Sequence, residues 1–161
     1  MNVDLAQKED LVRQIARSAG IEYVIITHKQ GGSTTADAEN ALQESSERIL
    51  KTLVLIDERA KKSVGIIIRG DKRLSMQKLK KLTGLKKLKF ASAEQVEAIT
   101  GFSLGGVPPV AVIRCDIAIV STDVLLMDYV IGAGGHPYCG MKFSPNELRK
   151  IPKILEVSVS I

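Results

Sequence analysis

Two neighbouring apolar runs decide the fold of this protein: residues 50–57 read LKTLVLID, and residues 63–69 read SVGIIIR. Both runs are rich in isoleucine, leucine and valine, a composition that favours β-strands. The polar residues 58–62, ERAKK, separate the two runs by a length that suits a hairpin turn. We therefore predict an antiparallel strand pair over residues 50–69.

Helices and further strands are predicted on both sides of this hairpin. Apolar spacing and capping residues predict helices over residues 4–19, 35–45 (capped by Thr35), 75–82, 92–100 (capped by Ser92) and 145–151. The last of these would open with a capping box at Ser144-Pro145-Asn146-Glu147. Strands are predicted over 21–27, 110–114, 116–120 and 129–131, with a helical turn over 122–127. Short strand-turn-strand units dominate, so the expected fold is α/β (α+β): a mixed sheet with flanking helices.

Length and composition bound the class of protein. A chain of 161 residues suits one domain, which we expect to span residues 1–161. Apolar residues make up 45% and charged residues 25%, which excludes a disordered or collagen-like chain. No apolar run approaches the roughly 18 residues of a membrane helix, and the N-terminus lacks a secretory signal pattern. The expected location is the cytoplasm, with no membrane partner.

Positive charge is concentrated in residues 69–89. This segment holds nine basic residues and one acid, whereas the whole chain carries a net charge of +5. Such a local excess is typical of a surface that binds a polyanion, and a solvated lysine-rich helix face produces the same pattern. The candidate RNA-binding residues in the segment are Lys72, Arg73, Lys78, Lys80 and Lys81.

Metal and nucleotide motifs are not evident. The chain has no Walker A motif, no dinucleotide-binding glycine pattern and no nucleophile elbow. His136 and Cys139 have ligand-like spacing, but a four-ligand zinc site would also need His28 and Cys115. The two cysteines are too few for a disulfide framework. We therefore expect ordinary thiols, no metal and no cofactor.

Two glycine-rich loops and two polar residues remain as candidates for a site. The loops are residues 105–109, GGVPP, and residues 132–137, GAGGHP. Each could bring bare backbone groups close to a ligand, or could be a tight turn between strands. Lys51 lies near the start of an apolar strand. It could be an exposed strand lysine, or its cation could be directed into a cleft. His136 is held on a constrained loop, which suits proton transfer or a local hydrogen bond.

Five motifs occur here in an order that resembles a known family. They are Lys51-Thr52-Leu53-Val54, Gly70-Asp71-Lys72-Arg73-Leu74, Thr100-Gly101-Phe102, Gly105-Gly106-Val107-Pro108-Pro109 and Ala133-Gly134-Gly135. Together they resemble the YbaK/prolyl-tRNA synthetase-associated editing domain family, the free-standing aminoacyl-tRNA deacylases, over nearly the whole chain. The resemblance implies a compact α/β domain around a mixed, barrel-like sheet. It also implies hydrolysis of the ester between a wrong amino acid and the 3′-terminal adenosine of a tRNA.

The resemblance also implies roles for individual residues. Lys51 matches the functional lysine of the family, and Gly105, Gly106, Val107 and Pro108 match its substrate loop. Gly134 and Gly135 match a second loop, and His136 resembles a histidine found there in several members, so Lys51 and His136 are the candidate catalytic residues. The chain departs from the family at Ser121-Thr122, where an acidic residue often follows the strand ending at Val120.

The expected function is that of a trans-editing deacylase acting on a tRNA for proline that carries alanine or cysteine. Its expected partners are the tRNA acceptor end and prolyl-tRNA synthetase. Two alternatives stay open from the residues. One is a tRNA-binding or nucleic-acid-binding regulatory module of the same fold with little hydrolytic activity. The other is a small-molecule hydrolase, which would leave the basic segment unexplained.

Overall fold

A five-stranded sheet is built on the predicted hairpin. In the computed structural model, which describes residues 3–28 and 34–161, β2 (Leu50–Asp57) and β3 (Lys62–Arg69) pair antiparallel. The order of the strands is β4-β2-β3-β5-β8. Strand β4 (Lys89–Phe90) lies antiparallel to β2, whereas β5 (Ile117–Val120) and β8 (Leu155–Glu156) extend the other edge in parallel. The sheet is therefore mixed, as predicted.

A second, three-stranded sheet lies beside the first. It is antiparallel throughout, in the order β1 (Val24–Thr27), β7 (Cys139–Phe143) and β6 (Val130–Ala133). The two sheets meet at an isolated parallel bridge between Ile49 and Ile131. The α/β fold class is confirmed, but the strands form two sheets that do not close into a barrel, because β6 leaves the edge of β2 after this bridge.

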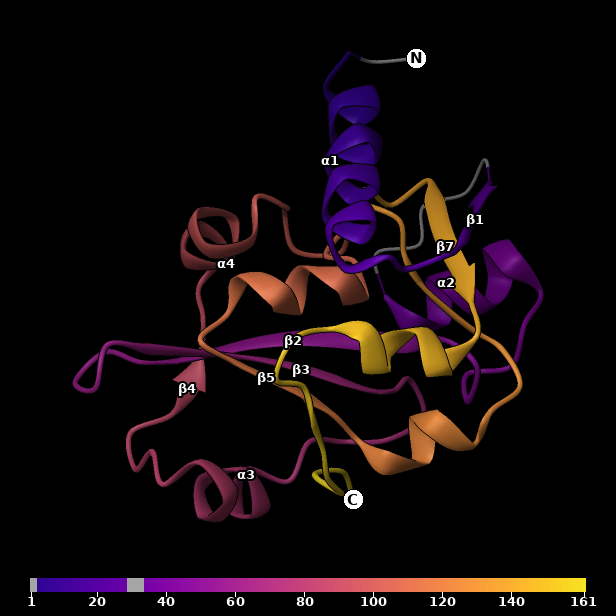
Figure 1. The fold of residues 1–161 in the computed structure, drawn as a ribbon. Coiled ribbons are helices and arrows are strands. Elements are labelled where there is room, and N and C mark those ends of the chain that lie inside the picture. Colours follow the sequence, from indigo (N-terminus) through magenta and orange to yellow (C-terminus); the bar gives the residue numbers. More distant parts are fainter. Residues whose placement is uncertain (1–2, 29–33) are drawn as a thin grey trace.

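Helices cover both sides of the five-stranded sheet (Figure 1). The α-helices are α1 (Val3–Ala19), α2 (Thr35–Leu42), α3 (Met76–Thr83) and α4 (Ala93–Thr100). The 3-10 helices are η1 (Pro109–Arg114), η2 (Thr122–Leu126) and η3 (Pro145–Lys150). Figure 1 shows α3 on one side of the sheet, and α1 and α4 on the other. Within the described ranges, every helix is too short or too polar to span a bilayer.

The alternation of side chains along β2 divides the core into two clusters. Leu50 and Val54 belong to the cluster that includes residues of α1, α4 and η1. Leu55 belongs to the second cluster, with Leu79 of α3. Because side chains alternate between faces along a strand, Lys51 shares the α3 face with Leu55. The sequence pattern of this one strand thus fixes the side of the sheet on which the candidate lysine lies.

Two predicted boundaries are shifted. Strand β1 begins at Val24 instead of residue 21, because the Ile21 N–H donates to the Ala16 carbonyl (2.9 Å) and so completes the end of α1. The second helix is capped by Thr34 instead of Thr35, through a hydrogen bond from the Asp37 N–H to Thr34 Oγ1 (3.1 Å). By contrast, the predicted cap at Ser92 is confirmed, and Ser75, where a helix was predicted to start, caps α3.

Two predicted elements are wrong. Residues 110–114 form a 3-10 helix instead of a strand, since Pro109 occupies its first position and the Ala111 N–H donates to the Pro108 carbonyl (3.0 Å). The C-terminal helix is also 3-10, and Ser144 makes no side-chain cap. The carboxylate of Glu147 instead accepts a hydrogen bond from the Glu22 N–H (2.7 Å). Strands β4, β7 and β8 were not predicted.

Candidate functional site

A cavity of about 320 Å³ lies where the two sheets separate. Its walls come from β2, β6, β7, one face of α2 and the loop that follows α4. Strand β4 contacts β2 only at Leu55 and Ile56, so the edge of β2 from Lys51 to Leu53 borders the cavity instead of a neighbouring described strand. Two strand edges, β2 and β6, thus present backbone groups to the same space.

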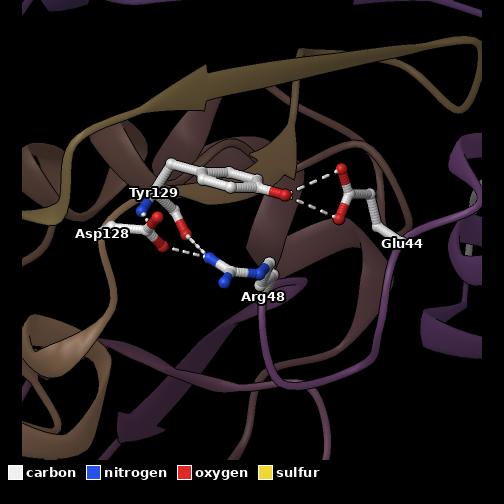
Figure 2. A network of polar contacts seen from close by, with 4 residues as sticks. All are labelled: Glu44, Arg48, Asp128 and Tyr129. Carbon is white, nitrogen blue, oxygen red and sulfur yellow. Dashed lines mark hydrogen bonds and ion pairs between the residues drawn. The ribbon is translucent and has the colours of Figure 1, made fainter.

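A polar network lies next to the bridge where the two sheets meet (Figure 2). The guanidinium of Arg48 lies 4.2 Å from the Tyr129 ring centroid and forms an ion pair with Asp128. The Tyr129 hydroxyl donates to the carboxylate of Glu44 (3.0 and 3.1 Å), and the ammonium of Lys142 lies 4.3 Å from the same ring. Arg48 also lowers the pKa of the Asp128 carboxyl through their hydrogen bond. The network therefore ties the segment before β2 to β6 and β7.

Lys51 lines the cavity, and its ammonium is held by the loop after β3. Lys51 Nζ donates to the carbonyl of Lys72 at 2.8 Å. The start of that loop is fixed in turn, because the Gly70 N–H donates to the Ile49 carbonyl (2.6 Å). Asp71 is neutralised by Arg69 through two hydrogen bonds (2.9 and 2.6 Å), and this pairing lowers the Asp71 pKa. The loop thus presents the backbone of Lys72 to Lys51.

The predicted glycine-proline loop is divided between the cavity and the interior. Gly105 and Val107 line the cavity. Gly106 and Pro108 do not: a Cβ on Gly106 would lie 2.9 Å from the Gly135 carbonyl oxygen, so the two glycine loops pack against each other at this point. The placement is compatible with a substrate role for Gly105 and Val107. It gives Gly106 a packing role.

The second glycine loop, Gly134–Pro137, connects β6 to β7. The Gly134 N–H donates to the Cys139 carbonyl (3.0 Å), and the Gly134 carbonyl accepts from the Cys139 thiol (3.0 Å). Gly135 has a φ of +110° and packs against α1, where an added Cβ would lie 3.0 Å from the Lys8 carbonyl oxygen. Neither glycine lines the cavity, although Gly132 and Ala133, which precede them, do.

His136 lies outside the cavity lining and is 5% exposed. Its Nδ1 accepts a hydrogen bond from the Tyr138 N–H (3.1 Å). Its Nε2 lies 3.7 Å from a carboxylate oxygen of Glu9 and is buried without a hydrogen-bond partner among the described residues. Both ring nitrogens are thus directed at the protein, and the structure does not bring His136 to Lys51.

Glu9, His136 and Cys139 each place one ligand atom within 4.8 Å of the others. The Cys139 thiol is protonated, because burial raises its pKa to about 12. The Cys139 thiol therefore donates to the Gly134 carbonyl instead of offering a thiolate ligand. Burial likewise raises the pKa of Cys115 to about 11, so neither cysteine supplies a thiolate at neutral pH.

The five candidate RNA-binding residues lie on α3 and on the loop before it. Arg73, Lys78 and Lys81 are exposed, whereas Lys72 and Lys80 are half-buried. Lys78 Nζ donates to the carbonyl of Ser160 (3.2 Å). Lys72 stands next to the cavity through its contact with Lys51, whereas Lys78, Lys80 and Lys81 belong to α3 and do not line the cavity.

Several cavity residues were not predicted as site residues. His28 and Leu104 line the cavity, and Leu104 is 59% exposed at its rim. Thr52 also lines it, and its Oγ1 is buried with no hydrogen-bond partner in the described part of the chain. Among these residues, only Thr52 could have been predicted as a site residue from the sequence, because it directly follows Lys51. The others come together only through tertiary contacts.

Known proteins share this sequence pattern and fold. The sequence model of the aminoacyl-tRNA editing domain matches residues 29–151. A proline–tRNA ligase of Dechloromonas aromatica is 28% identical over 149 residues, which are 88% of this chain and 26% of the ligase. The chain thus spans about a quarter of the length of the curated relatives that it matches.

Two crystal structures are similar over most of their length. A hypothetical protein is 32% identical, with a TM-score of 0.84 over 94% of this chain and 99% of the other. A protein described as a candidate trans-editing enzyme for prolyl tRNA synthetase is 25% identical. Its TM-score is 0.79 over 94% of this chain and 96% of the other.

Proposed function

Because the chain belongs to the aminoacyl-tRNA editing domain family, we propose that it is a trans-editing deacylase. Its substrate would be a tRNA for proline that carries alanine or cysteine, and its reaction the hydrolysis of the aminoacyl ester. The observation that carries this proposal is the cavity between β2 and β6, with Lys51 in its wall. We further propose that the chain acts as one editing domain in the cytoplasm, in support of prolyl-tRNA synthetase.

The lining of the cavity supports a small, uncharged amino acid. Apolar side chains dominate it, among them Leu50, Ile131 and Ala133, and no carboxylate of the described residues contributes to it. A synthetase distinguishes amino acids that differ by one methylene by only about 1–3 kcal/mol, so errors with smaller amino acids persist. A hydrolytic cavity that admits only small side chains would remove these errors as a second sieve.

The chemistry of the ester needs little from the protein. An aminoacyl ester is already activated, so a placed water and donors for the developing oxyanion suffice. Lys51 would hold the phosphate of the terminal adenosine or stabilise negative charge, and the exposed edges of β2 and β6 would orient the carbonyl. Since His136 is directed at Glu9 and Tyr138, we assign it no proton transfer and propose that the ribose hydroxyl of the tRNA assists the water.

A panel of mischarged tRNAs tests this proposal. We expect the protein to deacylate the proline tRNA that carries alanine or cysteine and to spare the same tRNA carrying proline. The measurement is the rate of loss of radiolabelled amino acid from each tRNA under single-turnover conditions. Binding of tRNA without hydrolysis of any ester in the panel would instead support the regulatory module of the same fold.

The basic residues predict a strong salt dependence of tRNA affinity. If Lys72, Arg73, Lys78, Lys80 and Lys81 each contact a phosphate, the log–log slope of affinity against salt should be about −4. Replacing Lys81 with glutamine should reduce the magnitude of that slope by about 1. The matched control is Lys62→Gln, which removes an exposed lysine outside the segment and should leave the slope unchanged. A flat salt dependence would support a solvated helix face.

A further inference from the structure

An exposed aromatic side chain lies on the same sheet edge as the cavity. Phe90 of β4 is 57% exposed, although Leu88, two residues before it, is buried in the core. Strand β4 pairs with β2 on the edge that β3 does not occupy, with Phe90 opposite Leu55. The cavity borders the same edge from Lys51 to Leu53. Phe90 and the cavity therefore follow one another along a single strand edge.

The register also fixes the face on which Phe90 lies. Cross-strand partners point to the same face of a sheet, so Phe90 shares the face of Leu55. Lys51 has the same alternation as Leu55 and projects from that face as well. Lys51 and Leu55, the partner of Phe90, are four positions apart on β2, which corresponds to about 13 Å at about 3.3 Å per residue. Nucleotides next to a terminal nucleotide in the cavity can cover this span.

The residues around Phe90 carry positive charge. Lys86, Lys87 and Lys89 are all exposed, and Lys89 forms an ion pair with Glu58 (3.1 Å). Within residues 3–28 and 34–161, the ammonium groups of Lys86 and Lys87 have no ion-pair partner. An exposed aromatic ring beside unpaired cations is the combination that binds single-stranded nucleic acid, because every base can stack on the ring while the cations contact phosphates.

We propose that Phe90 is a stacking platform for an unpaired base next to the 3′-terminal nucleotide of the tRNA. Lys86 and Lys87 contact the adjacent phosphates. The identity of the RNA rests on the proposed function, whereas the preference for an unpaired base rests on the exposed ring and its charged surroundings. The platform extends the RNA-binding surface beyond the five residues on α3 and its preceding loop to the edge strand β4.

A fluorescence measurement tests the stacking directly. The chain contains no tryptophan, so Phe90→Trp introduces a single indole at the platform. A single-stranded RNA oligonucleotide ending in CCA should quench this indole, and a blunt RNA duplex without an unpaired end should not. The matched control is Leu126→Trp, since Leu126 is also highly exposed (84%) but belongs to η2, and its indole should be unaffected.

Affinity measurements separate stacking from other roles. Phe90→Ala should weaken tRNA binding roughly tenfold, and Phe90→Tyr, which keeps a ring, should bind like the wild type. Phe90→Ala should hydrolyse a mischarged adenosine, which lacks the neighbouring nucleotides, at the wild-type rate. Unquenched fluorescence of Phe90→Trp with bound RNA, or wild-type tRNA affinity of Phe90→Ala, would overturn the platform. Quenching by an RNA whose mischarged form is not hydrolysed would uphold the platform and overturn the deacylase.

Discussion

Replacing Lys51 with methionine is expected to slow the deacylation of mischarged tRNA at least tenfold, which corresponds to about 1.4 kcal/mol of transition-state stabilisation. Methionine keeps most of the apolar stem of the side chain but removes the ammonium that donates to the Lys72 carbonyl. The melting temperature should stay close to that of the wild type, because Lys51 is half-buried at the cavity wall and makes its described hydrogen bond to a loop.

The matched control for this variant is Lys62→Met. Lys62 begins β3 at the far end of the hairpin, opposite Asp57, and is exposed. Its replacement changes the net charge by the same amount and should leave the deacylation rate unchanged. Equal rates for Lys51→Met and the wild type would remove Lys51 from the site. A rate loss shared by both variants would attribute the effect to overall charge.

Gly135→Ala should destabilise the protein by about 3 kcal/mol and lower its melting temperature by roughly 10 °C. Two physical causes add here. The φ of +110° lies in a region that residues with a Cβ rarely adopt, and the new Cβ would lie 3.0 Å from both the Lys8 carbonyl oxygen and a methyl group of Val12. The backbone of α1 cannot yield as the end of a flexible side chain does. Thermal unfolding followed by circular dichroism gives the measurement.

Gly84→Ala separates the two causes. Gly84 also has a positive φ, of +72°, but nothing lies within 4 Å of its would-be Cβ. This variant should therefore show the backbone strain without the clash and lose about 1 kcal/mol. Below its melting temperature, Gly135→Ala should retain hydrolysis in proportion to its folded fraction, because Gly135 lies outside the cavity lining. Complete loss of hydrolysis in a folded Gly135→Ala protein would instead indicate that this loop belongs to the substrate site.

The sequence predicted those helices and strands that are determined by residues close together in the chain. The hairpin over residues 50–69 follows from two apolar runs and a polar turn, and the helix capped by Ser92 follows from capping chemistry. Residues 110–114 look like a strand for the same reason, since Val and Ile dominate. The prolines before them and the surrounding core impose a 3-10 helix instead.

The candidate site was harder to predict, because tertiary contacts assemble it. Lys51 and the loop of Gly105 and Val107 were expected at a site through the family resemblance, and they line one cavity. Gly135 and His136 were expected there for the same reason, yet they pack against Lys8, Val12 and Glu9 of α1. Sequence spacing cannot reveal this, since the first helix is distant in the chain. Strand β7 was missed because Gly140 and Lys142 interrupt its apolar pattern.

The bridge between Ile49 and Ile131 is the point from which the edges of β2 and β6 diverge. The network of Arg48 and Tyr129 lies beside this bridge. Three residues of a strand span about 10 Å, so a change of about 5° in the angle between β2 and β6 would move the ends farthest from the bridge by about 1 Å. That displacement approaches the length of a carbon–carbon bond. Under the proposed function, the angle between the two strands at this bridge would therefore set the width of the cavity that distinguishes amino acids differing by one methylene.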